Sequence, residues 1–193
     1  MTRVLLSNKE YFPAGLRVRS LAFGLDYLPI ALYLILLFVV AVVANRVWQP
    51  VVNRLFGDPI SGEVSGFVLI TLPISLYFAV SEASSSRATW GKRKMHLQVT
   101  DLTGGRVSPT RSLGRTALKF IPWELAHACI WQISFAADKS LPIYTAGFAI
   151  VWLLAAANVI SLLISPNHET LYDWASGTLV VAASGRSLHH QIL

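Results

Sequence analysis

The sequence predicts an all-α integral membrane protein: four transmembrane helices, both termini in the cytoplasm, a cytoplasmic β-hairpin-like loop and a C-terminal interfacial helix. Of its 193 residues, 54% are hydrophobic and only 13% are charged. Soluble domains carry about 25% charged residues, so this chain cannot coat a soluble surface with so few charges. Long apolar stretches alternate with basic segments, which indicates a single transmembrane domain over residues 1–193.

The four spans are expected at about 25–44, 64–81, 117–137 and 141–164. A helix of about 20 residues crosses a hydrocarbon core of about 30 Å. The first and fourth stretches are the most apolar, the second is marginal in length, and the third contains polar residues. The spans must be helical because lipid cannot satisfy backbone polar groups, and the apolar runs do not alternate as barrel strands would.

The distribution of lysine and arginine predicts the orientation. With four spans, thirteen cations fall on the side that holds the N-terminal arm, the 82–116 loop with Lys119 just after it, and the 165–193 tail, and three fall on the other side. Cytoplasmic loops carry the excess of positive charge, so this side is expected to be cytoplasmic, in the inner membrane of the cell. The net charge of +6 then favours anionic lipid headgroups over nucleic acid as a partner.

The 82–116 loop has a recognisable pattern. Met95, Leu97 and Val99 alternate with polar residues, and Gly104 and Gly105 follow, which predicts a short hairpin with a glycine turn. Ser108 and Pro109 then suit the first positions of a helix.

Basic residues of this loop are candidates for lipid contact. Arg111 and Arg115 are four residues apart and share a helical face. We expect Lys92, Arg93, Arg111 and Arg115 to contact headgroups, with a solvated loop that obeys the topology rule as the alternative.

The tail predicts a short interfacial helix. Asn167 or Ser165 can cap it, an apolar face includes Trp174, and Gly177 can end it. Trp174 is expected at headgroup depth, and the TLVV that follows Gly177 is too short to span.

Four motifs in order resemble the RDD family of membrane proteins, from about residue 13 to about residue 182. They are the segment from Arg19 to Asp26, the Thr89-Trp-Gly-Lys loop with its following hairpin, Arg115-Thr116, and Asp173-Trp-Ala-Ser-Gly-Thr. The chain departs from the family pattern in its Pro122–His127 segment and in a tyrosine at position 172 where histidine is common.

The resemblance implies the same membrane architecture, and it maps the three name-giving residues to Arg19, Asp26 and Asp173. It also implies transport, with sodium–proton exchange proposed for some members of the family and membrane assembly as the role that others resemble.

Arg19 and Asp26 lie about 10 Å apart along one face of the first helix, so a third group must bridge them. We expect a cluster of Arg19, Asp26, Asp173 and one loop cation, Lys92 or Arg115. One interpretation is a structural staple between the first span, the loop and the tail. The other is ion coupling, in which Asp26 binds a proton or sodium ion and Arg19 tunes its pKa.

Glu124 and His127 share a face of the third span and form a second candidate site. The open alternatives are a hydrogen-bonded pair with Asn158 or Thr71, a proton or cation pathway, and a metal site. Glu-x-x-His occurs in helical-bundle metal centres, but two ligands do not make a site, so no metal is predicted.

The sequence carries no phosphate loop and no catalytic triad, so we expect neither an enzyme nor a cofactor. The single Cys129 cannot form an internal disulfide. Two functions remain open: a transporter of ions or small solutes, which would act as a homo-oligomer, and a non-catalytic partner that binds lipid or another membrane protein.

Overall fold

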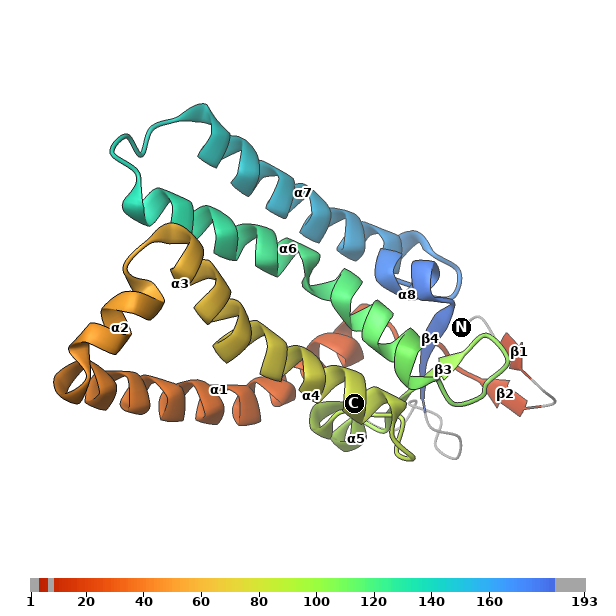
Figure 1. Ribbon diagram of the computed structural model, residues 1–193. Helices are drawn as coiled ribbons and strands as arrows, with labels where there is room; N and C mark the ends of the chain where they lie inside the picture. The colour runs from red at the N-terminus through yellow and green to blue at the C-terminus, as the bar shows by residue number, and fades with distance from the viewer. Residues whose placement is uncertain (1–3, 7–8, 183–193) are drawn as a thin grey trace.

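The structure is a computed structural model that describes residues 4–6 and 9–182, in which long helices lie along one another and a small sheet closes one end (Figure 1). We call this the sheet end. Arg3 and Arg186, which were counted for the topology, lie outside the described residues. The helices are α1 (Leu16–Val47), α2 (Gln49–Phe56), α3 (Pro59–Gly66), α4 (Leu72–Ala83), α5 (Trp90–Lys94), α6 (Pro109–Phe135), α7 (Pro142–Ile164) and α8 (Leu171–Ser176).

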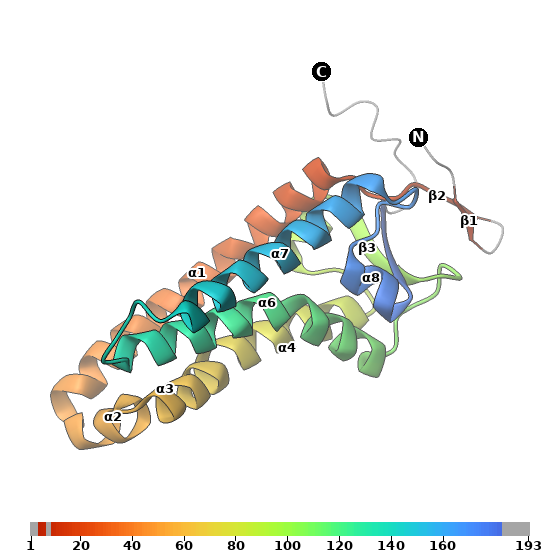
Figure 2. The same cartoon turned by 90° about the horizontal axis from the view of Figure 1, so that it is seen from above.

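Three helical segments are long and apolar enough to cross a membrane: Leu16–Val47, Pro59–Ala83 and Pro142–Ile164. The 27-residue α6 packs between α4 and α7 and runs alongside both (Figure 2). Its lower apolarity comes from the charged residues in its first turns and from Glu124. The structure thus has a membrane-type helical bundle, and the count of four spans stays a prediction.

The first helix begins nine residues before the expected start of its span, because Leu16 already has helical geometry. Its 32 residues are about 48 Å long at 1.5 Å per residue, which exceeds the hydrocarbon core. Only 6% of its most apolar window is buried within the protein. Most of this helix therefore presents its side chains to the surroundings of the bundle.

The second segment starts at Pro59, earlier than the expected residue 64, because the Asp58 side chain caps it by accepting hydrogen bonds from Ile60 N and Ser61 N, both 3.0 Å. A π-helical turn, η1 (Phe67–Thr71), joins α3 to α4. Pro73 lies in the first turn of α4 and lacks the N–H that a regular helix would use.

The sheet end corrects the expected hairpin. Strand β3 (Leu97–Asp101) pairs antiparallel with β4 (Thr178–Ala182) from the tail, with Val99 opposite Val180. A second pair joins β1 (Val4–Leu6) to β2 (Lys9–Tyr11). The glycine turn after β3 forms, but it returns to β3 by a single bridge, Thr100 to Arg106. The alternating pattern was a strand whose partner lies about eighty residues away.

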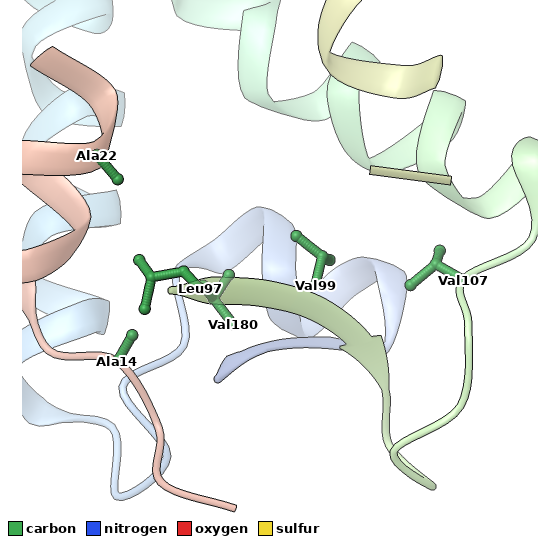
Figure 3. Close-up of a cluster of buried hydrophobic side chains, with 6 residues drawn as sticks. All are labelled: Ala14, Ala22, Leu97, Val99, Val107 and Val180. Atoms are coloured by element: carbon green, nitrogen blue, oxygen red, sulfur yellow. The ribbon is translucent and has the colours of Figure 1, made fainter. Parts of the chain in front are cut away.

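Apolar side chains join the sheet to the start of the first helix. Figure 3 shows this cluster, in which residues of the two strands meet the N-terminal part of α1 and the segment before α6. All members are at most 1% exposed: Ala14, Ala22, Leu97, Val99, Val107 and Val180. The TLVV segment is thus a buried strand that anchors the tail to the bundle.

The tail helix forms at the expected place with a different cap. Thr170, not Asn167 or Ser165, accepts a hydrogen bond from Asp173 N, and the Asp173 side chain accepts one from Thr170 N. This reciprocal arrangement is a capping box. Gly177 ends the helix in the left-handed conformation with φ 60°. Trp174 is 74% exposed, so it is free to contact lipid.

Candidate functional site

The structure brings Arg19 and Asp173 together at the sheet end. Arg19 Nη1 donates to Asp173 Oδ2 at 2.6 Å, and Arg19 Nε donates to the Ala14 carbonyl at 3.0 Å. Asp173 is completely buried. The α8 capping box holds this carboxylate, because the same Oδ2 accepts from Thr170 N. The ion pair therefore joins the first helix to the tail.

Arg115 extends this pair into a network. Its Nη2 donates to Asp173 Oδ1 at 2.5 Å, and its Nε contacts the same oxygen at 3.0 Å. Its Nη1 donates to Glu82 Oε2, and Glu82 Oε1 accepts from the Lys92 ammonium. Arg115 is 2% exposed and Glu82 is fully buried. These ion pairs thereby connect α1, α4, α6 and α8 with the loop helix α5.

The electrostatics of Asp173 follow from this network. Burial alone would raise the pKa of its carboxyl, but the charges of Arg115 and Arg19 outweigh burial and hold that pKa below its usual value. Asp173 is therefore ionised at neutral pH, as the two guanidinium groups require.

Asp26 does not join the ion pairs, which corrects the expected cluster. Its three partners are neutral donors: Tyr77 OH at 2.7 Å, Thr89 Oγ1 at 2.6 Å and Gly91 N at 2.7 Å. Thr89 is also the N-cap of α5, so the loop helix begins against this carboxylate. At Gly91 a side chain would strike the Ala22 carbonyl of α1, so only glycine permits this approach.

Glu82 was missed as a member of the network. Reasoning from the sequence did not place it in the charge cluster. Its position gave a signal, because a carboxylate at the end of an apolar span, directly before a strongly basic loop, needs a cationic partner. Sequence alone does not say which of the seven cations of the 82–116 loop, or Lys119 just after it, supplies that partner.

The lipid-headgroup role expected for Arg115 is wrong, because this side chain is buried between two carboxylates. Lys92 also pairs with Glu82, and its side chain is 13% exposed, so headgroup contact stays a prediction for it. Arg93 and Arg111 are exposed, and headgroup contact stays a prediction for both. Arg111 and Arg115 therefore face different surroundings.

A cavity of about 260 Å³ opens beside the network, between α1, α4, α6, α7 and the tail. Its charged lining consists of Arg19, Asp26, Lys92, Arg115 and Lys119. With Glu82 and Asp173 included, four basic and three acidic side chains meet at this site, which is a formal excess of one positive charge when all of them are ionised. Such a cavity is suited to an anionic group.

Lys119 is the basic side chain left over in that formal count. Its Nζ lies 3.2 Å from the centroid of the Phe78 ring, with the Phe23 and Phe120 rings at 5.4 and 5.7 Å. Rings attract a cation through their electron-rich faces but accept no conventional hydrogen bond. Among the described residues, no carboxylate lies within 4.0 Å of this ammonium. Sequence reasoning counted Lys119 only as a loop cation.

Glu124 and His127 form a separate polar group farther along α6. Thr71 donates to Glu124 Oε1, and Trp123 Nε1 donates to Thr71 Oγ1 at 3.0 Å. Glu124 Oε2 lies 3.9 Å from His127 Nδ1, and Trp131 Nε1 donates to His127 Nε2 at 2.9 Å.

Of the two partners suggested for this pair, the structure supplies Thr71. Asn158 instead donates to the Leu154 carbonyl of its own helix. No group of three or more His, Cys, Asp or Glu side chains able to hold a metal occurs in residues 4–6 and 9–182.

Comparison with protein families gives one match: the RDD family, over residues 13–177. The matched range includes both carboxylate sites, from Arg19 to Asp173. Neither the comparison with curated proteins nor that with solved structures gives a match.

Proposed function

The chain belongs to the RDD family of membrane proteins, and from this premise we propose that it moves a small negatively charged solute across the inner membrane. The observation that carries the proposal is the cavity with one excess positive charge at the sheet end of the apolar bundle. In a purely structural cluster of ion pairs, we would expect a fourth carboxylate to pair with Lys119, because unpaired buried charges are costly.

The proposal places α6 as the fourth span, with the sheet end in the cytoplasm. Two observations support this orientation: α6 packs along two segments long enough to span, and thirteen of sixteen cations then lie on the cytoplasmic side. A solute would then enter the cavity from the cytoplasmic face. Four spans enclose little space, so a complete pathway calls for a homo-oligomer.

Cation–proton exchange at Asp26 receives less support from the geometry. A carboxylate that exchanges a proton for a cation must expose an oxygen to that cation, whereas both Asp26 oxygens already accept hydrogen bonds from neutral donors. We propose instead that Asp26 positions the Thr89–Gly91 turn, which in turn brings Lys92 to the cavity.

Flux measurements in proteoliposomes test the proposal. We expect uptake of labelled phosphate or carboxylate anions by the unaltered protein, and loss of uptake in Lys119→Gln. Lys139→Gln is the matched control, because this lysine is exposed and far from the cavity lining. Parallel vesicles with sodium, potassium and lithium gradients and a pH dye test the exchange alternative with Asp26→Asn and Glu124→Gln. Folded protein that moves none of these ions would overturn the proposal.

A role as a partner in a membrane assembly is the second candidate, and α1 favours it. Consecutive apolar side chains are exposed along its second half, among them Leu32, Leu36 and Phe38, at 61–69%. Such a helix can pack against another membrane protein as well as against lipid. Co-purification of one defined partner, lost when these side chains become alanine while anion flux is absent, would favour this candidate.

A further inference from the structure

An apolar groove adjoins the cationic cavity. The groove has a volume of about 170 Å³ and runs between α1, α4 and α6. The two spaces share three lining residues, Phe23, Phe78 and Lys119. Lys119 therefore lies at the junction, with charge on one side and aromatic and aliphatic side chains on the other.

The groove is apolar along its length. Phe23, Tyr27, Ile30 and Leu34 follow one another on one face of α1, at the spacing of about one helical turn. Ile74 and neighbouring residues of the second segment form the opposite wall. Exposed Tyr27 and Trp123 lie at its margin, so the groove opens toward the side of the bundle. In a bilayer that side faces acyl chains.

The cavity wall holds two buried polar atoms without a partner in the part of the chain that the structure describes. They are Arg19 Nη2, a donor on a side chain that is 10% exposed, and Asn158 Oδ1, an acceptor. Most buried polar atoms in folded proteins have a partner, and an exception indicates a missing ligand or water. The Lys119 ammonium adds donors that no carboxylate among the described residues accepts.

We propose that this joined space binds an anionic membrane lipid, with the head group against Lys119 and Arg19 and an acyl chain along the groove. The charge selects an anion, because one cation in excess faces the cavity. The groove selects a lipid, because a free inorganic anion would leave the apolar walls unused. The small volume favours a single-chain head and tail over a complete two-chain lipid.

The inference has two parts, that the lipid binds and that the protein moves it. The second part rests on the proposed function, because the bound lipid would be the transported solute. Binding itself does not depend on movement. Lipid binding without any flux would support the lipid site and contradict the proposed transport. Anion flux without lipid binding would support transport and contradict the lipid site.

Quenching of tryptophan fluorescence by a brominated acyl chain tests the binding directly. Trp123 lines the groove, so a chain seated there comes into contact with its ring. Brominated lysophosphatidate and brominated lysophosphatidylcholine carry the same chain on an anionic and on a zwitterionic head. We expect saturable quenching at concentrations about tenfold lower for the anionic head, and loss of that component in Trp123→Phe.

The head-group preference is then assigned with variants. Lys119→Gln should remove the preference, Lys119→Arg should keep it, and the matched control Lys139→Gln should leave it unchanged. Leu34→Phe narrows the groove and should weaken quenching by both lipids. Thermal melting of each variant in the same detergent establishes that it is folded, and the head-group comparison on the unaltered protein decides even where a variant fails.

Three results would overturn the proposal. The first is equal quenching by the two lipids in the unaltered protein. The second is a head-group preference that persists in folded Lys119→Gln. The third is displacement of the brominated lipid by inorganic phosphate as effectively as by unbrominated lysophosphatidate, which would identify a site for a free anion.

Discussion

Asp26 and Asp173 are both completely buried at the same end of the molecule, yet they are stabilised in different ways. Asp173 is paired with two guanidinium groups, while Asp26 accepts hydrogen bonds from a tyrosine, a threonine and a backbone amide. The first arrangement depends on negative charge and the second on acceptor geometry. The family resemblance groups these two aspartates, but replacing each by asparagine should lower the free energy of unfolding by different amounts.

Asp173→Asn should give the largest loss of stability, about 3–5 kcal/mol, because it leaves Arg19 and Arg115 buried without their shared counter-charge. Asp26→Asn should cost about 1–2 kcal/mol, since the amide oxygen still accepts from Tyr77 or Gly91 and the Thr89 hydroxyl can reverse. Unfolding in mixed micelles gives both values. Equal losses would erase the distinction between the two acids.

Gly91→Ala should come next, at about 1–3 kcal/mol, because the added methyl group meets the Ala22 carbonyl and pushes α5 away from Asp26. Gly114→Ala is the matched control in α6, where nothing lies within 4 Å of the new methyl group. The control should be neutral or stabilise the helix slightly. Comparable melting of the two variants would show that the α1–α5 contact is not needed.

Thr170→Ala tests the support of Asp173 without touching its charge. The variant loses the cap that Thr170 provides to α8, at about 1 kcal/mol, while both arginine contacts remain. Ser165→Ala is the control, since sequence reasoning chose that residue as a cap and the structure does not use it. A larger loss in the Ser165 variant, measured by thermal unfolding, would contradict the capping assignment.

The smallest effect concerns pH. Asp173 has a lowered pKa in the folded protein, so its contribution is complete above the pKa of the unfolded chain and declines as pH falls. Between pH 7 and pH 3.5 we expect this carboxyl alone to cost about 0.7 kcal/mol, given an unfolded pKa of about 3.9. Unfolding of the unaltered protein and of Asp173→Asn at both pH values gives the difference. If the stability of Asp173→Asn fell more steeply with decreasing pH than that of the unaltered protein, the stabilising role of ionised Asp173 would be contradicted.

The sequence predicted the helices well, because long apolar runs and cap residues such as Ser108 are local signals. Charge counting and the resemblance also placed Arg19 and Asp173 in one cluster, and these two side chains form an ion pair in the structure. The resemblance to the RDD family is confirmed over residues 13–177.

The features that the sequence did not predict depend on contacts between segments that are far apart in the chain. Alternation at 95–99 indicated a strand but could not say that its partner was 178–182. The same limit hid Glu82, whose two cations come from α5 and α6. Arg115 was assigned to lipid because helical spacing gives a face but not what covers that face. The periodicity of a sequence predicts the structure of one segment, whereas it does not predict which other segment that one contacts.

The β3–β4 pair has a consequence for how the chain is made. Translation proceeds from the N-terminus, so α1, α4 and α6 are synthesised before Asp173 and residues 178–182 exist. Until then Arg19 and Arg115 lack their shared carboxylate, and β3 lacks its only partner strand among the described residues. The tail therefore completes the ion pairs and the β3–β4 pair only after the long helices have been synthesised. A ribosome that stalls before it releases a bundle with an open strand edge and unneutralised cations, a form that proteases and chaperones can distinguish from the finished protein.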